Sequence, residues 1–245
     1  MVINVHGGHN RIVPGASGYL DEVTEDRAVT AQVIAKLRAL GHTVFDCTDD
    51  SGRTQGQNLA NIVHACNAHA ADLDVSIHLN SGGGTGTEVL VYSDTGAAAG
   101  YAVKICAAIA ELGYRNRGVK ERKNLYVLRH TTAPALLVEC CFVDSAADAQ
   151  RFDADKMAAA IVRGITGQTA AQTGAAPAQQ TGYHVRITAS TLNVRRDHSA
   201  SSAVATQVRR GEVYTIVDEY NNCGTLWGKL KSGAGWIALK YTQSV

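Results

Sequence analysis

The chain has 245 residues, of which 45% are hydrophobic and 18% are charged, and its formal net charge is +1. This composition is typical of globular proteins, and the absence of any apolar run long enough to cross a bilayer excludes an integral membrane protein. The length fits one ordinary domain followed by a small one.

The first two thirds of the chain alternate short apolar runs with amphipathic stretches. In chain order these are VINVH, EDRAVTAQVIAKLRALG, HTVFDC, NLANIVHACNAHA, LDVSIHL, TEVLVYS, a helix over about 97–112, the run LYVLRH, the apolar run ALLVECCFV and a closing helix over about 146–165. Such alternation predicts an α/β domain with a twisted, mostly parallel sheet that carries helices on both faces. Sites in such sheets form at the carboxyl ends of the strands.

The remainder of the chain has a different character. Residues 167–182 read GQTAAQTGAAPAQQTG, which has no charge and no large apolar side chain and therefore predicts a flexible linker. The short runs YHVRITA, TLNVRR, VYTIVDEY, TLWGKLK and AGWIAL follow, and they predict a small all-β barrel. We therefore expect a first domain over 1–167, a linker over 168–182 and a second domain over 183–245.

The charge and cysteine patterns indicate the kind of partner that the second domain suits and the compartment in which the chain is made. Residues 183–245 carry eight Lys or Arg against four Asp or Glu, an excess that suits an anionic polymer or a plain solvated surface. The six cysteines form no CxxC pair, and the adjacent Cys140 and Cys141 disfavour an ordinary disulfide between them. Reduced thiols and the lack of a visible secretory signal in MVINVHGGHN lead us to expect synthesis in a cytoplasm.

Two histidines follow predicted strands and are expected to meet at one edge of the sheet. His9 comes after VINVH and a glycine pair, where the backbone must turn, although a lone histidine there can simply cap a strand. His78 ends DVSIHLN, and strand alternation places Ser76 on the same face with Asn80 just beyond.

Two carboxylates complete the candidate site. Glu22 precedes the first predicted helix, but spacing alone does not separate it from Asp21, Glu25 and Asp26, any of which suits a helix N-terminus. Two imidazoles and one carboxylate leave the fourth position of a tetrahedral zinc open, which is the catalytic arrangement. Glu139 directly follows an apolar strand, where a carboxylate is costly unless it is solvated, paired or close to a metal.

The order GHN, PGASG, Glu22, DVSIHLNSG, TEVLVYS and RGVKERKNLYVLRHTTAPALLVECCFVD resembles the zinc-dependent N-acetylmuramoyl-L-alanine amidases of bacterial autolysins and phage endolysins, the type 3 amidases. The resemblance covers residues 1 to about 166. It implies one zinc ion (Zn2+) held by His9, Glu22 and His78, with Glu139 as the catalytic carboxylate. Glu22 is preferred to Glu25 because its distance to LRALG matches the family pattern. The segment HGGHN departs from the usual Pro-Gly-His-Gly-Gly motif, and this leaves His6 as a rival to His9.

The tail resembles bacterial SH3-like domains through TLNVRR, RRGEVYTIVDEY and LWGKLKSGAGWIALKYT. In such domains the residues equivalent to Trp227 and Trp236 belong partly to the core, so no wall-binding residue is assigned. The resemblance implies a module that binds the cell wall.

Together these patterns predict a peptidoglycan hydrolase that cleaves the amide between N-acetylmuramic acid and L-alanine with a zinc-activated water. We expect the cell wall as partner, no nucleic acid, no membrane insertion, and action on the wall after release, as in phage lysis; the oligomeric state stays open. The alternatives are a zinc peptidase acting within the stem peptide and a non-catalytic wall-binding protein. A basic stretch expected to form a loop, either solvated or binding stem-peptide carboxylates, comprises Arg115, Arg117, Lys120, Glu121, Arg122 and Lys123.

Overall fold

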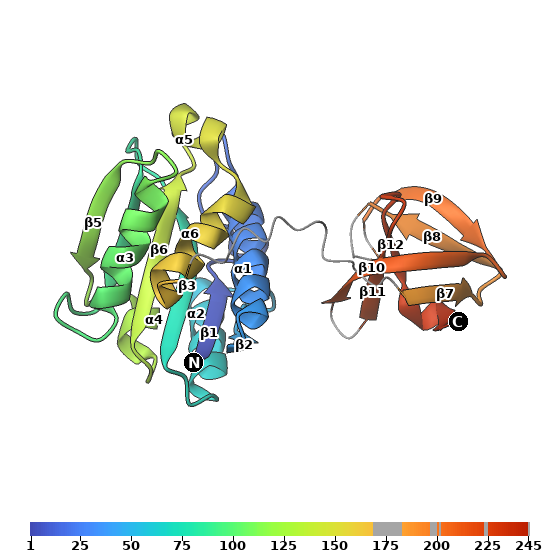
Figure 1. Ribbon diagram of the computed structural model, residues 1–245, viewed down its shortest axis with the longest axis horizontal. Helices are drawn as coiled ribbons and strands as arrows, with labels where there is room; N and C mark the ends of the chain where they lie inside the picture. The colour runs from blue at the N-terminus through green and yellow to red at the C-terminus, as the bar shows by residue number, and fades with distance from the viewer. Residues whose placement is uncertain (169–182, 197–199, 201, 223–224, 245) are drawn as a thin grey trace. The chain divides into compact units, whose positions relative to one another are not determined.

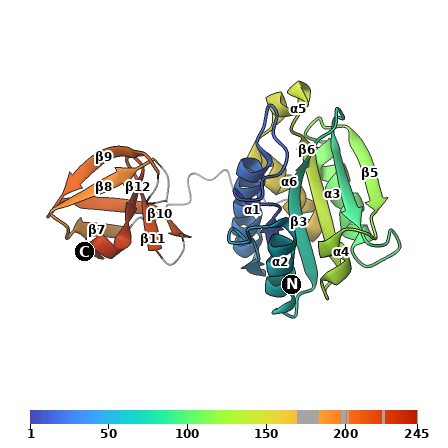
Figure 2. The same cartoon turned by 180° about the vertical axis from the view of Figure 1, so that it is seen from behind.

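A computed structural model of the chain describes residues 1–168, 183–196, 200, 202–222 and 225–244 (Figures 1 and 2). The chain divides into two compact units, Met1–Gln172 and Thr173–Val245. The predicted linker, 168–182, lies outside the described residues except for its first residue. The proposed domain limits therefore stay predictions.

The first unit is built on a six-stranded sheet with the order β2-β1-β3-β6-β4-β5. Its strands are β1 (Val2–Gly7), β2 (Thr43–Asp46), β3 (Leu73–Asn80), β4 (Thr87–Val91), β5 (Asn116–Glu121) and β6 (Ala135–Phe142). All neighbouring pairs are parallel except β4 with β6. Strands β4 and β5 consequently run opposite to the other four.

Helices cover both faces of this sheet, as the two views show (Figures 1 and 2). They are α1 (Glu22–Ala39), α2 (Gln55–Asn67), α3 (Ala99–Ala110), α4 (Tyr126–His130), α5 (Ala146–Arg151) and α6 (Ala154–Thr166). Buried residues of α1, α3 and α6 form one core cluster with the sheet, whereas those of α2 and α4 form another. Strand alternation explains the division, because Val138 faces the first cluster and Leu137 the second. The predicted α/β class with a mostly parallel sheet is confirmed.

Three local expectations were wrong. The stretch expected to be a basic loop contains β5, an edge strand that pairs only with β4, and LYVLRH forms the short helix α4 rather than a strand. An apolar run of this length does not distinguish the two forms by periodicity. The closing helix is interrupted near Asp153, whose side chain accepts hydrogen bonds from the backbone N–H groups of Asp155 and Lys156 and so begins a new helix.

The second unit is an antiparallel sheet with the order β13-β7-β10-β11-β12-β8-β9. Its strands are β7 (Tyr183–Ile187), β8 (Thr191–Arg195), β9 (Val204–Arg209), β10 (Val213–Asn222), β11 (Thr225–Leu230), β12 (Trp236–Ala238) and β13 (Thr242–Ser244), with a 3-10 turn over Leu239–Tyr241. Trp227 is buried and Trp236 is half-buried, in keeping with their expected place in the core. The small all-β unit is confirmed, whereas its SH3-like character stays a prediction.

Two further observations bear on the sequence-based expectations. Cys47, Cys66, Cys106, Cys140 and Cys141 are all buried, free thiols. Among the described helices, none combines the length and the apolar character needed to cross a bilayer.

Asp74, in the middle of the sheet, gives a stability test. The residue is 2% exposed, and its Oδ1 accepts a 2.6 Å hydrogen bond from the Asn4 amide, while its Oδ2 has no hydrogen-bond partner within the described part of the chain. Burial raises the pKa of Asp74 from its ordinary value of 3.8 to about 6, against the opposing effect of the Asn4 hydrogen bond.

The folded state thus holds this proton more tightly than the unfolded chain, and the free energy of unfolding falls as pH rises from about 4 to about 6. We expect Asp74→Asn to stabilise the protein relative to wild type by about 1 to 3 kcal/mol at pH 7.5 and to lose this advantage near pH 4. Urea unfolding of both proteins at the two pH values measures the difference. An advantage that does not change with pH would contradict the assignment.

Candidate metal centre

Three side chains from three different elements meet at one edge of the sheet. His9 follows β1, Glu22 is the first residue of α1, and His78 lies near the end of β3. One ligand atom from each lies within 4.8 Å of the other two, an arrangement that can hold a metal ion. Glu22 Oε1 is 3.1 Å from His78 Nδ1 and 3.6 Å from His9 Nε2.

Helix α1 and its preceding turn fix the position of Glu22. Asp21 caps the helix by accepting a hydrogen bond from the backbone N–H of Thr24, so that Glu22, the next residue, begins the helix at the edge of the sheet. Glu22 Oε2 accepts the backbone N–H of Ala16 at 2.8 Å, and Oε1 accepts that of Leu79 at 3.2 Å. The structure therefore places Glu22, and neither Asp21, Glu25 nor Asp26, beside the two histidines.

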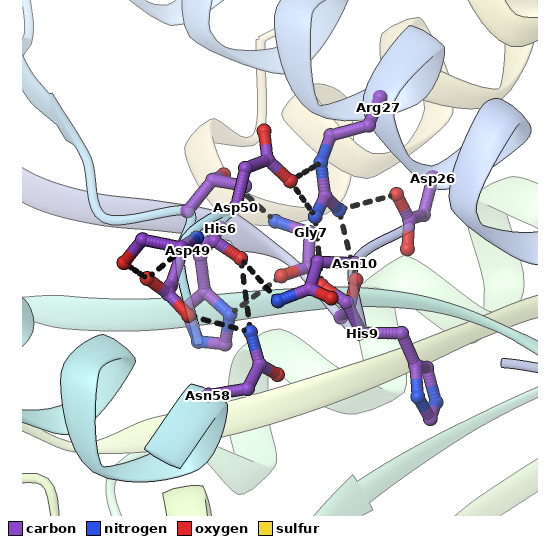
Figure 3. Close-up of polar contacts among 12 residues, drawn as sticks. His6, Gly7, His9, Asn10, Asp26, Arg27, Asp49, Asp50 and Asn58 are labelled. Atoms are coloured by element: carbon purple, nitrogen blue, oxygen red, sulfur yellow. Dashed lines mark hydrogen bonds and ion pairs between the residues drawn. The ribbon is translucent and has the colours of Figure 1, made fainter. Parts of the chain in front are cut away.

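The backbone at His9 adopts an unusual conformation. Its φ is 50°, in the left-handed region that residues other than glycine seldom occupy. Arg27 of α1 stabilises this turn, because its Nη1 donates to the carbonyl of Gly8 at 2.8 Å and its Nη2 to that of His9 at 2.7 Å. The same guanidinium pairs with Asp26 at 2.7 Å and Asp50 at 2.8 Å. Figure 3 shows the His9 ring directed away from this network.

A second set of contacts fixes the next part of the loop (Figure 3). Asn10 Oδ1 accepts the backbone N–H groups of residues 12 and 13, and its Nδ2 donates to the Gly52 carbonyl at 2.9 Å. Asn58 of α2 donates to both the backbone carbonyl and the side chain of Asp49. Although burial opposes it, hydrogen bonds from Ser51 and Asn58 lower the pKa of Asp49 to about 2, which keeps this anchor ionised.

His6, the rival of His9, occupies a different environment. It is 1% exposed, and its Nδ1 lies 3.5 Å from Ser76 Oγ and 3.3 Å from the Gly7 carbonyl. Burial lowers the pKa of His6 to about 3, so it is a neutral core histidine. Among the described residues, the cluster able to hold a metal contains His9 and not His6.

Glu139 lies beside the cluster without belonging to it. It stands inside β6 rather than after it, and it is paired in register with His78 on the neighbouring strand, which puts both side chains on the same face. Its Oε2 is buried and has no hydrogen-bond partner among the residues that the structure describes. Burial, opposed by His78 and reinforced by Glu22 and Glu88, raises the pKa of Glu139 from its ordinary value of 4.5 to about 7. A carboxyl group of this kind is ready to exchange a proton at neutral pH.

The electrostatics of His9 and Glu22 suit a metal. Burial, followed by the proximity of His78, lowers the pKa of His9 and favours the neutral imidazole that binds metals. Although burial opposes it, the hydrogen bond from His78 lowers the pKa of Glu22, so its carboxylate stays ionised. Two imidazole nitrogens and one carboxylate oxygen form a donor set that zinc commonly uses in catalytic sites.

Comparison with known proteins shows the family to which the chain belongs. Residues 1–167 match the family model described as N-acetylmuramoyl-L-alanine amidase. The chain belongs to this family. The sporulation-specific N-acetylmuramoyl-L-alanine amidase of Bacillus subtilis is 31% identical over 209 residues, which cover 83% of this chain and 80% of that protein.

Among solved structures, the catalytic domain of the CD27L endolysin that targets Clostridia difficile is 26% identical, with a TM-score of 0.64, and the match covers 69% of this chain and 98% of that domain. An uncharacterised protein of Clostridium perfringens is 37% identical over 154 residues, which make up 60% of this chain. The chain spans about half the length of such relatives, with 45% of the Clostridium protein covered. The amidase family is therefore established for the N-terminal unit.

Sequence reasoning missed the residues that hold this candidate metal centre in place. Arg27 lies in an amphipathic helix, and Asp49 and Asn58 lie in and near a polar loop, where such residues are usually solvated. Nothing in their spacing shows that they meet the loop after β1. Their contacts depend on how α1 and α2 pack across the sheet edge.

Gly8 offers a test of the cluster that changes none of its ligands. A Cβ at Gly8 would lie 1.9 Å from His78 Cε1, whereas one at Gly56, exposed on α2, would meet nothing within 4 Å. We expect Gly8→Ala to displace the His78 ring and weaken Zn2+ binding by about 10- to 100-fold, as loss of supporting contacts does elsewhere. Gly56→Ala is the matched control and should bind Zn2+ like wild type. Competition with a chromogenic chelator measures the Zn2+ affinity of each variant. Equal affinities of Gly8→Ala and wild type would exclude the cluster as the metal site.

Proposed function

We propose that the N-terminal unit is a zinc-dependent amidase that hydrolyses the bond between N-acetylmuramic acid and L-alanine in peptidoglycan. The observation that carries the proposal is the juxtaposition of the His9, Glu22 and His78 cluster with the unpartnered carboxyl group of Glu139. Membership of the N-acetylmuramoyl-L-alanine amidase family supports the choice of substrate.

The donor set fits a single zinc ion. His9, Glu22 and His78 would hold it, and three protein ligands leave the open position that a catalytic zinc requires. When bound, zinc would acidify a water and polarise the scissile carbonyl. The neighbouring residues are already fixed by backbone hydrogen bonds to Glu22 and by Arg27 behind His9, so little reorganisation accompanies binding.

Glu139 supplies the proton transfers in this proposal. Its Oε2, which no protein group satisfies, accepts a proton from the attacking water, and the carboxyl group then delivers the proton to the leaving amine of L-alanine. Its raised pKa suits both steps, because the group must take up a proton and release it again near neutral pH. The products are a glycan strand and a stem peptide that begins with L-alanine.

The alternatives differ in their products. A peptidase acting within the stem peptide would release shortened peptides, and a wall-binding protein would release none. Mass spectrometry of digested wall separates the three. Family membership and the unligated Glu139 favour the amidase.

Replacing Glu139 by Gln keeps the shape of the side chain and removes the proton acceptor. We expect Glu139→Gln to lose about 10²- to 10⁴-fold in turnover while binding zinc as wild type does. Glu121→Gln, at an exposed residue paired with Lys123, is the matched control and should retain full activity. Release of L-alanyl peptides from purified peptidoglycan, with zinc content measured in parallel, provides the readout.

Chelation of the wild-type protein should abolish this activity, and added zinc should restore it. Loss of zinc from Glu139→Gln would move this residue into the ligand set, and near wild-type turnover would eliminate its proposed role.

We further propose that the second unit is an SH3-like module that binds the wall. Its support is the all-β architecture and the excess of four positive charges over 183–245. A module joined by a tether raises the concentration of the enzyme at an insoluble polymer without contributing to the chemistry.

Fragments test this division. We expect residues 1–167 to hydrolyse soluble muramoyl-peptides at nearly the rate of the whole chain and intact walls more slowly, because the ligands and Glu139 are all retained. Residues 183–245 should sediment with purified walls, less so as salt rises, and should show no hydrolysis. Failure of the first fragment on the soluble substrate would show that the second unit helps to build the site.

A further inference from the structure

A row of polar side chains crosses the sheet next to the candidate metal centre. His78 of β3 pairs in register with Glu139 of β6, and Glu139 pairs with Glu88 of β4. On the far side of β4 lies β5, whose residue Arg117 donates from Nε to Glu88 Oε2 at 2.8 Å. Paired residues on adjacent strands project from the same face, so the row leads from the metal ligands to a cation.

A β-bulge places Arg117 at the end of this row. Thr87 pairs with Asn116 and Val89 with Val119, so Glu88 alone faces the two residues Arg117 and Gly118. Gly118 has a φ of 77°, and its N–H donates to Asn116 Oδ1 at 2.8 Å. Bulges reorient the side chain at the insertion, and a glycine is favoured where φ is positive.

The guanidinium of Arg117 is held on two sides. The Glu88 side chain, only 8% exposed, is itself fixed by a 3.1 Å hydrogen bond from Asn80 Nδ2. The Phe142 ring lies beneath the guanidinium, with its centroid 4.9 Å from Arg117 Cζ. An arginine restrained in this way loses little conformational entropy when it binds a further partner.

The outer part of the Arg117 guanidinium is available to bind a further partner. Arg117 is 31% exposed, and among the residues that the structure describes, neither Nη1 nor Nη2 makes a hydrogen bond. Glu88 occupies only the Nε side. Two parallel N–H donors therefore remain, the geometry that binds a carboxylate in a bidentate manner.

We propose that Arg117 binds a stem-peptide carboxylate and so determines which peptides are cleaved. The inference rests on the proposed amidase function. The lactyl carboxyl group of muramic acid is consumed in the scissile amide, which leaves the stem peptide as the anionic part of the substrate. Glu139 and Arg117 are two strand spacings apart, about 10 Å, so the carboxylate belongs to a residue close to the cleaved bond. We assign it to the residue that follows L-alanine.

Two other cations of this stretch, Arg122 and Lys123, lack these restraints. Lys123 pairs with Glu121 and is 60% exposed, and Arg122 is exposed and donates to the backbone carbonyl of Glu121. Neither is braced by a buried carboxylate and an aromatic ring. Arg122 therefore serves as the matched control for Arg117.

The test uses two synthetic muramoyl-tripeptides with amidated C-termini. They differ only at the second residue, a glutamate joined to the third residue through its side-chain carboxyl group, so that its α-carboxyl group is a free carboxylate in one substrate and a carboxamide in the other. The whole zinc-loaded chain is assayed as wild type, Arg117→Gln, the double variant Glu88→Gln/Arg117→Gln and Arg122→Gln. The double variant avoids leaving Glu88 buried without its cation.

We expect wild type and Arg122→Gln to prefer the carboxylate in kcat/KM by about 10- to 100-fold, and both Arg117 variants to lose this preference. The loss should come from the carboxylate substrate alone. If Arg117 had a merely structural role, its variants would lower kcat/KM for both substrates equally and keep the ratio of the two values, and this result would overturn the proposal. A wild-type protein without a preference between the substrates would also overturn it. Failure of wild type to cleave either substrate would instead refute the proposed function.

Discussion

The half-buried guanidinium of Arg27 organises the edge of the sheet where the candidate metal centre forms. Arg27 pairs with Asp26, which is fully buried, and it also requires acceptors for its remaining donors. The carbonyls of Gly8 and His9 supply them and in doing so hold His9 in a left-handed conformation that costs on the order of 1 to 3 kcal/mol. The Arg27–Asp26 pair in the core and the orientation of the His9 side chain thus depend on the contacts of one guanidinium.

Charge also explains why cations are needed at both ends of the polar row. Glu22, Glu139 and Glu88 bring three carboxyl groups to one edge of the sheet, and the first and last of these raise the pKa of the middle one. A metal ion held beside Glu22 would compensate one end, and Arg117 compensates Glu88 at the other. Glu139 lies between them and takes part in no ion pair with the residues that the structure describes, and its raised pKa lets it exchange a proton near neutral pH.

Much of the fold and of the metal cluster could be predicted because each depends on patterns that are local in the chain. Alternating apolar and amphipathic stretches indicated the parallel sheet, and strands that run the same way bring the residues after β1 and β3 to one edge. That rule fails for β4 and β5, which run in the opposite direction, so their amino ends lie at the site. Glu88 and Arg117 therefore stand at the beginnings of strands, where a search of carboxyl ends does not find them. The prediction for the short run LYVLRH was wrong for another reason, because its helix depends on packing against α2.

The strand order also has a consequence for synthesis on the ribosome. β6 is the last strand of its sheet in the chain, yet it lies between β3 and β4 (Figure 1). Until residue 142 has emerged, β2-β1-β3 and β4-β5 can form only as two separate ribbons, because β3 and β4 lack the neighbour that β6 provides. Open edges invite pairing with other chains, and long-range closure is slow. Glu139 arrives on the strand that joins the ribbons, so the hydrolase is assembled only when this closing step is complete and the nascent chain cannot act before it.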